Sequence, residues 1–294
     1  MNMNPFHRAL RSAALALLLA APLAGAQVPQ KTYGQELVDQ TLAHNPGLRA
    51  MLLRAAPPGA ADAVVAASNI GRIGTSGHDE LELGGGAEPR AVVLPDGHSA
   101  AVELPLENLV GEPVGMLVLL WPYRPRTPLS VFIRRAETIR DTLARRILNS
   151  ANLFDPYPLD PAITTRNRAQ KLVDAAQAAQ PEIEVLAVRG HVGADGELVL
   201  LGSTFGRQGK KADGDDLKVL ASTAPNTGIY SDGKRFGVDL ALHDRAGAVI
   251  GTMNVGYAWH EGADGEALVR HALTLRQRLE AQIAPGQVLD VLDP

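Results

Sequence analysis

The chain contains two copies of one long segment, and this duplication constrains its fold more than any other feature. Leu37–Ile147 aligns with Leu172–Ile283 at a constant offset, apart from one residue inserted in the second copy. Such sustained self-similarity indicates a duplicated domain, and it favours a binding or sensing module over a single catalytic centre. The offset pairs like residues along the whole segment: Pro46 with Pro181, Gly71 with Gly206, Arg72 with Arg207, and Asp96 with Asp232.

The segment 1–26 has the pattern of a secretory signal peptide. A basic start with Arg8 and Arg11 precedes the apolar run Ala13–Ala24, and small residues lead up to Ala26. We expect cleavage after Ala26 and export to the periplasm. The alternative is an uncleaved membrane anchor, although the apolar run is short for a bilayer span.

The composition limits which cellular compartment and which binding partners suit the chain. The chain has no cysteine and therefore no disulfide, which suits a Gram-negative periplasm better than a eukaryotic extracellular space. The net charge of −4 becomes −6 when Arg8 and Arg11 leave with the signal peptide, so we expect no nucleic-acid partner. The other strongly apolar segment, Val114–Trp121, is typical of a buried strand, and no direct membrane insertion is expected after cleavage.

Each repeat is predicted to run helix, two strands, short helix, three antiparallel strands, helix. The opening helices, about Tyr33–His44 and Arg166–Ala179, end before prolines, because the residue before proline avoids helical geometry. Asp-Gly pairs between alternating strands predict hairpins. The fold class is therefore α+β, with two tandem domains that each hold a roughly five-stranded, mostly antiparallel sheet flanked by long helices. The remaining predicted elements of the first repeat are strands Leu48–Arg54, Ala63–Ala67, Arg90–Leu94, Ala100–Leu106 and Val114–Trp121, a short helix after Asp79, and a closing helix Leu129–Leu148. Those of the second are strands Ile183–Val188 and Glu197–Leu201, a short helix after Asp215, and a closing helix Gly265–Ile283.

These patterns divide the chain into a signal peptide (1–26), a first domain (27–148), a linker (149–165), a second domain (166–284) and a tail (285–294). The linker is assigned from its three prolines, which fall between the closing helix of one repeat and the opening helix of the next. The order of elements, the segments ASNIGRIG at 67–74 and GSTFGRQGKKADGDDL at 202–217, and the hairpins resemble the Cache family, the extracellular PAS-like sensor domains of bacteria.

The resemblance implies two PAS/Cache-like domains and small-ligand binding on one face of a sheet. Members usually lie between transmembrane helices and feed a cytoplasmic kinase, cyclase or chemotaxis domain, which this sequence does not show. We therefore expect signalling through a membrane-bound receptor or kinase. The Tyr/Arg/Trp/Asp set with which many members hold amino acids is not evident, so the ligand class does not carry over.

The glycine-rich loop 206–216 is the densest polar stretch of the chain. Its glycines permit close backbone approach to a ligand, and Arg207 and Lys210 can pair with a carboxylate or phosphate. The spacing fits neither a phosphate-binding loop nor a calcium loop. The alternative is a solvated loop in which Asp215 or Asp216 caps the short helix and Arg207 is structural.

The predicted strand Arg235–Leu242 is more informative about a ligand site, because side chains alternate between the two faces of a sheet along a strand. Phe236, Val238, Leu240 and Leu242 share the predicted core face, whereas Arg235, Gly237, Asp239 and Ala241 share a small, polar face that suits a pocket. The first repeat has plainer residues here: Ser99, Ala101 and Glu103 on the same strand, Leu94 for Tyr230 and Val118 for Asn254. The alternative is a face exposed to solvent. The predicted ligand-binding residues are Arg207, Lys210, Tyr230, Arg235, Asp239, Asn254 and Tyr257.

No pattern predicts catalysis, a metal or a cofactor. The histidines lack metal-binding spacing, there is no cysteine nucleophile, and no G-x-S-x-G elbow is present. The sequence favours a soluble periplasmic sensor of a small polar ligand, of the amino-acid or organic-acid class, and not an enzyme. The alternatives are a periplasmic interaction or scaffold protein without a small ligand, and a hydrolase of unrecognised type.

Overall fold

The computed structural model describes residues 30–76, 83–84, 86–192, 196–222 and 224–292. The predicted signal peptide and the short helix expected after Asp79 lie outside these residues. Among the residues described, no helix is both long enough and apolar enough to cross a bilayer.

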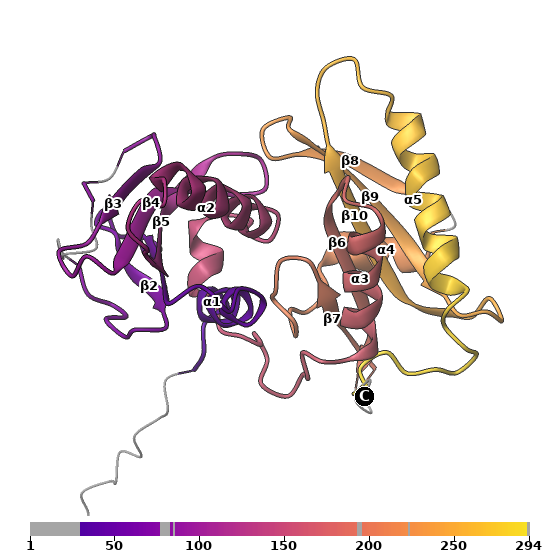
Figure 1. Ribbon diagram of the computed structural model, residues 1–294. Helices are drawn as coiled ribbons and strands as arrows, with labels where there is room; N and C mark the ends of the chain where they lie inside the picture. Colours follow the sequence, from indigo (N-terminus) through magenta and orange to yellow (C-terminus); the bar gives the residue numbers. More distant parts are fainter. Residues whose placement is uncertain (1–29, 77–82, 85, 193–195, 223, 293–294) are drawn as a thin grey trace, which may run out of the picture. The chain divides into compact units, whose positions relative to one another are not determined.

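Each repeat forms an antiparallel five-stranded sheet with helices, and the chain is a mixed α+β protein (Figure 1). The strand orders, β2-β1-β5-β4-β3 and β7-β6-β10-β9-β8, are the same when the strands are counted within each repeat. The first repeat comprises α1 (Tyr33–His44), β1 (Ala50–Ala55), β2 (Val64–Ser68), β3 (Arg90–Val93), β4 (Ser99–Glu107), β5 (Pro113–Pro122) and α2 (Leu129–Ala144). The second comprises α3 (Arg168–Ala179), β6 (Ile183–Val192), β7 (Glu197–Ser203), α4 (Gly214–Leu220), β8 (Asn226–Tyr230), β9 (Arg235–His243), β10 (Val249–Ala258) and α5 (Gly265–Glu280).

The opening helices are capped and anchored in the same way in both repeats. The side chains of Thr32 and Asn167, which occupy equivalent positions in the two copies, accept from backbone N–H groups three residues later, at 3.2 and 2.8 Å. These bonds satisfy donors that a helix start leaves unpaired. The side-chain oxygens of Gln35 and Gln170 then accept from the backbone N–H groups of the serines that end β2 and β7, at 3.1 and 2.9 Å. The duplication therefore extends to individual hydrogen bonds.

Each repeat buries its own apolar core between its helices and one sheet face. The predicted alternation along β9 is confirmed: Val238, Leu240 and Leu242 are at most 1% exposed in the second core, and Phe236 packs against it. The opposite face of β9 is consequently free to carry the polar residues of a site.

The linker between the repeats has secondary structure of its own and contacts the second repeat. It contains a short 3-10 helix, η2 (Ser150–Phe154), whose start is capped by the Asn149 side chain at 3.0 Å from Asn152 N. Asp155 accepts from Arg207 Nε at 2.7 Å, so the linker is tied to the glycine-rich loop of the second repeat. Arg207 and its counterpart Arg72 share a positive φ of 66°, so this loop has the same unusual backbone shape in both repeats.

The closing helices end earlier than predicted, at Ala144 and Glu280 instead of Leu148 and Ile283. The chain turns after each helix, with Ile147 N donating to Ala144 O at 3.2 Å and Ile283 N donating to Glu280 O at 3.1 Å. Ile147 and Ile283 remain fully buried in the two cores. The apolar periodicity in the sequence therefore continues past the end of each closing helix, because the turn after it still places an isoleucine in the core.

Candidate functional site

A half-open pocket of about 250 Å³ lies on the polar face of the second sheet, opposite the core. We call it the sheet pocket. The pocket is a hollow, so this face is not the flat surface that would favour the scaffold alternative. Its lining comes from β6, β9 and β10, from α4 and the end of β8, and from two flanking residues: Leu148, Val185, Arg189, Phe205, Asp213, Asp215, Asp216, Tyr230, Arg235, Gly237, Asp239, Asn254 and Gly256.

Two glycines keep the floor of the sheet pocket low enough for large side chains to lie across it. A Cβ placed on Gly237 would come 2.6 Å from the Tyr230 ring, so this ring lies over the backbone of β9. A Cβ on Gly256 would come 2.9 Å from Cδ of Arg235. Because Gly256 pairs with Gly237, Arg235 leans inward along β9 toward Asp239. The separation of about 13 Å expected for residues four apart on a strand is thereby shortened at the side chains.

Asp239 is held by neutral donors on both neighbouring strands. Asn226 on β8 donates to Oδ2 at 3.1 Å, and Asn254 on β10 donates to Oδ1. The register places both asparagines directly opposite Asp239. These amides orient the carboxylate without neutralising it, so its negative charge remains available to a cationic group in the pocket.

Arg235 supplies the opposite charge, and it is half-buried. Burial lowers the pKa of its guanidinium, and the nearby Glu184 carboxylate partly offsets this effect. Burial in turn raises the pKa of Glu184, whose Oε2 is buried and has no hydrogen-bond partner in the described part of the chain. Among the described residues no carboxylate lies within ion-pair distance of Arg235, so its guanidinium can pair with a ligand.

The helix α4 forms a wall of the sheet pocket and brings three aspartates to it. Asp213 begins the helix with a capping box: its side chain accepts from Asp216 N at 3.2 Å, and Asp216 Oδ2 accepts from Asp213 N at 3.0 Å. Asp216 also lies 3.0 Å from Arg189 Nε on β6, as an ion pair that is not aligned as a hydrogen bond. Burial raises the pKa of Asp216, and the Arg189 charge opposes this rise. These contacts fix α4 over the sheet. The predicted cap, Asp215 or Asp216, was wrong, because the capping residue is Asp213.

Replacing Asp213 with alanine should therefore loosen this wall. Hydrogen bonds from the backbone, first that of Asp216, hold the pKa of Asp213 below its usual value. A lowered pKa means that its contribution is present above the ordinary aspartate pKa of about 3.9 and is lost as the pH falls below it. We expect Asp213→Ala to cost about 1 kcal/mol of unfolding free energy at neutral pH. Urea unfolding at pH 7 and at pH 3 measures this, and an equal loss at both pH values would contradict it.

The same sheet face in the first repeat is largely filled, and it keeps only a smaller pocket of about 100 Å³ beside Glu103 among the described residues. Leu52, Val65 and Val118 are each 1% exposed and form a separate apolar cluster there with Leu94 and Leu120. The repeat alignment places Ala187, Leu200, Asn254, Tyr230 and Gly256 at the equivalent positions of the second repeat. Two bulky apolar side chains are thus replaced by polar ones, Leu52 by alanine, and Leu120 by glycine. The first repeat therefore serves as a natural comparison for the second. Apolar side chains occupy most of this sheet face in the first repeat, whereas the second repeat has the sheet pocket there.

Four of the seven predicted ligand-binding residues, Tyr230, Arg235, Asp239 and Asn254, line the sheet pocket together. The other three lie elsewhere. Arg207 binds Asp155 of the linker, Lys210 is exposed outside the pocket lining, and Tyr257 is 3% exposed in the second core.

Sequence reasoning missed Arg189, the aspartates of α4 as lining residues, and Gly256. For Gly256 the repeat alignment carried the signal, because glycine stands there in place of Leu120. Within the described part of the chain, no group of three or more His, Cys, Asp or Glu is arranged to hold a metal ion.

Comparison with known proteins finds only distant similarities to solved structures. No family model and no curated protein matches the chain. The E. coli DhaR(N)-DhaL complex is 11% identical over 77% of this chain and 84% of that chain, with a TM-score of 0.24. An extracellular ligand-binding receptor from Desulfohalobium retbaense is 11% identical over 77% of this chain but only 33% of the receptor, with a TM-score of 0.21. An RNA-binding light-oxygen-voltage receptor is 12% identical over 65% of this chain and 82% of that chain, with a TM-score of 0.17. These values establish neither a family nor a ligand for the chain.

Proposed function

We propose that this protein is an exported, non-enzymatic sensor of a small polar ligand, built from two tandem PAS/Cache-like domains. The contrast between the two repeats carries the proposal: leucines and valines fill most of one sheet face and leave a pocket of about 100 Å³, whereas its counterpart is a polar pocket of about 250 Å³. A scaffold that binds no small ligand would not need a polar pocket in one of its two repeats. The predicted signal peptide supports a periplasmic location, and a membrane-bound receptor or kinase would receive the signal.

The charges around the sheet pocket indicate the class of ligand. Four aspartates and two arginines line it, and one aspartate and one arginine pair with each other. The groups at the floor that are not in ion pairs among the described residues are the Asp239 carboxylate, held by two asparagines, and the Arg235 guanidinium, whose side chain leans inward over Gly256. A ligand with an amine at one end and a carboxylate or hydroxyl at the other meets both, because each charge then gains an opposite partner or a hydrogen bond. Amino acids and hydroxy acids have this chemistry.

A thermal-shift screen of the mature chain, residues 27–294, against amino acids, organic acids, amines and purines tests the proposal. A ligand present at 100 times its dissociation constant adds about 2.7 kcal/mol to the unfolding free energy, which gives a clear rise in Tm. We expect zwitterions or hydroxy acids to give the rise, and purely apolar compounds to give none. The absence of a rise across the whole library would favour the scaffold alternative.

A further inference from the structure

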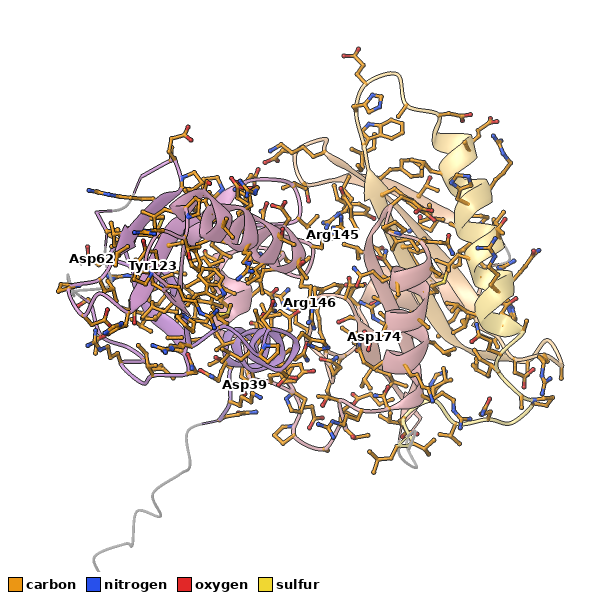
Figure 2. The ribbon with its side chains drawn as sticks, in the orientation of Figure 1. Asp39, Asp62, Tyr123, Arg145, Arg146 and Asp174 are labelled. Carbon is orange, nitrogen blue, oxygen red and sulfur yellow. The ribbon has the colours of Figure 1, made fainter. Side chains whose placement is uncertain are left out.

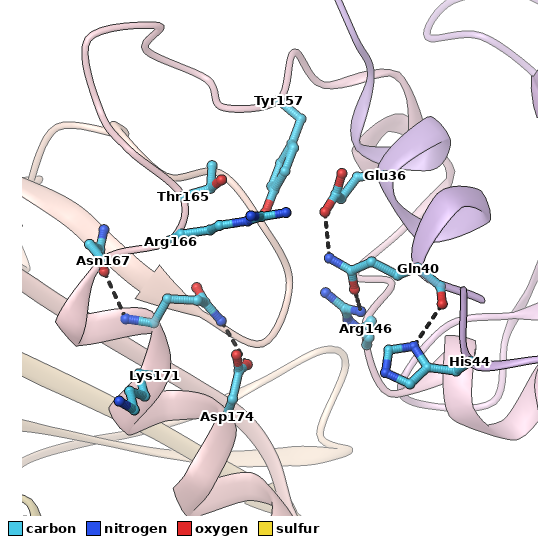
Figure 3. Close-up of a pocket in the computed structure, with 11 residues that line it drawn as sticks. Glu36, Gln40, His44, Arg146, Tyr157, Thr165, Arg166, Asn167, Lys171 and Asp174 are labelled. Atoms are coloured by element: carbon cyan, nitrogen blue, oxygen red, sulfur yellow. Dashed lines mark hydrogen bonds between the residues drawn. The ribbon is translucent and has the colours of Figure 1, made fainter. Parts of the chain in front are cut away.

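A second cavity, of about 530 Å³, lies outside the sheet pocket, and we call it the helix cavity (Figure 3). Its lining comes from α1, from the turn after α2, from the linker and from the start of α3. None of its lining residues belongs to the sheet pocket. The residues that matter for its chemistry are Gln40, Arg146, Tyr157, Arg166 and Asp174.

Arg146 is fixed in the lining by its own backbone and by a neutral partner. Its carbonyl oxygen accepts from the hydroxyl of the fully buried Tyr33 at 3.1 Å. Its guanidinium donates through Nη1 to the side-chain oxygen of Gln40 on α1. A guanidinium has five donors, and the amide oxygen of Gln40 takes only one of them and carries no charge. The Asp174 carboxylate, which also lines the cavity, acts on the Arg146 charge through a Coulomb interaction. Arg146 is thus positioned with donors left for an anion.

The repeat alignment shows that the fold does not require an arginine at this position. The counterpart of Arg146 is Gln282, just before the matched isoleucine, and its side chain donates to Arg278 O, in the last turn of α5, at 3.0 Å. The second repeat closes its core at Ile283 without the positive charge. Arg146 is therefore an addition to the shared scaffold, and it lies where the cavity is.

Arg166 is the second cation, and here the alignment shows a change in pairing. Its counterpart in the first repeat is Lys31, which binds Glu36 at 2.5 Å and Asp39 at 2.6 Å. In the second repeat the position of Glu36 is occupied by Lys171, so one of the two acids is replaced by a cation.

The acid that remains in the second repeat keeps the amide partner that its counterpart has. Asp174, the counterpart of Asp39, accepts from Gln170 Nε2 at 2.9 Å, just as Asp39 accepts from Gln35 at 2.8 Å. Among the described residues Arg166 makes no ion pair, and Figure 3 shows its side chain extended beside Tyr157. The guanidinium of Arg166 is thus free to meet a ligand.

We propose that Arg146 and Arg166 form an oxyanion site in the helix cavity, which takes a small carboxylate or phosphate compound. The planar guanidinium fork matches both groups, with two parallel N–H···O bonds. A volume of about 530 Å³ accommodates a whole small organic acid. The site does not depend on the sheet pocket, and it gives this chain a second binding function.

Calorimetric titration of the mature chain at low ionic strength tests the site with two probes, inorganic phosphate and citrate. We expect at least one probe to bind the wild type. Arg166→Gln and Arg146→Gln should each weaken that binding about tenfold or more, which is the worth of a charge-assisted hydrogen bond. Binding of phosphate alone assigns the site to phosphate compounds, and binding of citrate alone assigns it to organic acids.

Arg145→Gln is the matched control, because Arg145 is the arginine that precedes Arg146 at the same turn (Figure 2). Arg145 is not among the residues that line the helix cavity. This variant should bind the probe as the wild type does. The proposal is overturned if neither probe binds, if Arg166→Gln binds normally, or if Arg145→Gln loses as much as the other two. Arg166 is exposed, so its variant tests the site even where Arg146→Gln disturbs folding. Asp239→Asn should keep this binding, which separates failure here from failure of the sheet pocket.

Discussion

Replacing Asp239 with asparagine is expected to abolish the rise in Tm that the ligand gives, while the protein stays folded. The carboxylate is the only acid on the floor of the sheet pocket, and the two side chains that donate to it, those of Asn226 and Asn254, are neutral amides. Asparagine has nearly the same shape and loses the charge that a ligand amine would meet. A charge-assisted hydrogen bond is worth about 1.5–3 kcal/mol, so affinity should fall about 10- to 100-fold. Thermal shift over a ligand titration measures the fall.

Glu103→Gln is the matched control for Asp239→Asn, because Glu103 is the equivalent residue of the first repeat. Glu103 is 3% exposed, in a repeat whose corresponding face is largely filled by apolar residues and keeps only a pocket of about 100 Å³. We expect Glu103→Gln to keep the full ligand response and to lower the Tm without ligand, because a deeply buried acid is costly to disturb. If both variants lose stability alike and each keeps the ligand response, the second repeat is not the binding domain.

Local patterns predicted the fold well because its elements are specified locally. Prolines end the opening helices, Asp-Gly pairs mark the hairpins, and alternation along β9 separates core from pocket. The same alternation explains why Asn254 lines the pocket and Tyr257 does not. Residues two apart share a face, so Gly256 follows Asn254 on the pocket side and Tyr257 turns into the core.

The parts that sequence reasoning missed depend on contacts between distant segments. The polar, glycine-rich loop suggested a ligand role for Arg207, with a structural role as the alternative, but its partner Asp155 lies far back along the chain, in the linker. Arg189 and Asp216 meet only when α4 folds onto the sheet. No spacing along the chain encodes these pairs, because they depend on how loops return to the sheet. The helix cavity is of the same kind, since its lining draws on four separate segments.

Substituting alanine at Gly251 should have the largest effect on stability of any single change considered for the second repeat. A Cβ there would lie 1.9 Å from the carbonyl oxygen of Arg189 on the paired strand, and Gly115 has the same relation to Arg54 in the first repeat, at 2.0 Å. Both contacts are with backbone, which cannot move without breaking the hydrogen-bond ladder between β6 and β10, or between β1 and β5 in the first repeat. We expect each substitution to cost about 3 kcal/mol or more. Gly214→Ala and Gly47→Ala are controls, because a Cβ at either position meets nothing within 4 Å.

The two substitutions also test whether the repeats fold as separate domains, since each repeat contains one of the two tryptophans. Trp121 is 4% exposed in the first core, and Trp259 stacks on Phe236 at the second. The two cores share no residue, so destabilising one need not destabilise the other. In urea unfolding of single-tryptophan variants, Gly251→Ala should shift the transition reported by Trp259 and leave that of Trp121 near its original midpoint. Gly115→Ala should do the reverse. If either substitution moves both transitions equally, the contacts through the linker, such as that of Arg207 with Asp155, join the repeats into one cooperative unit.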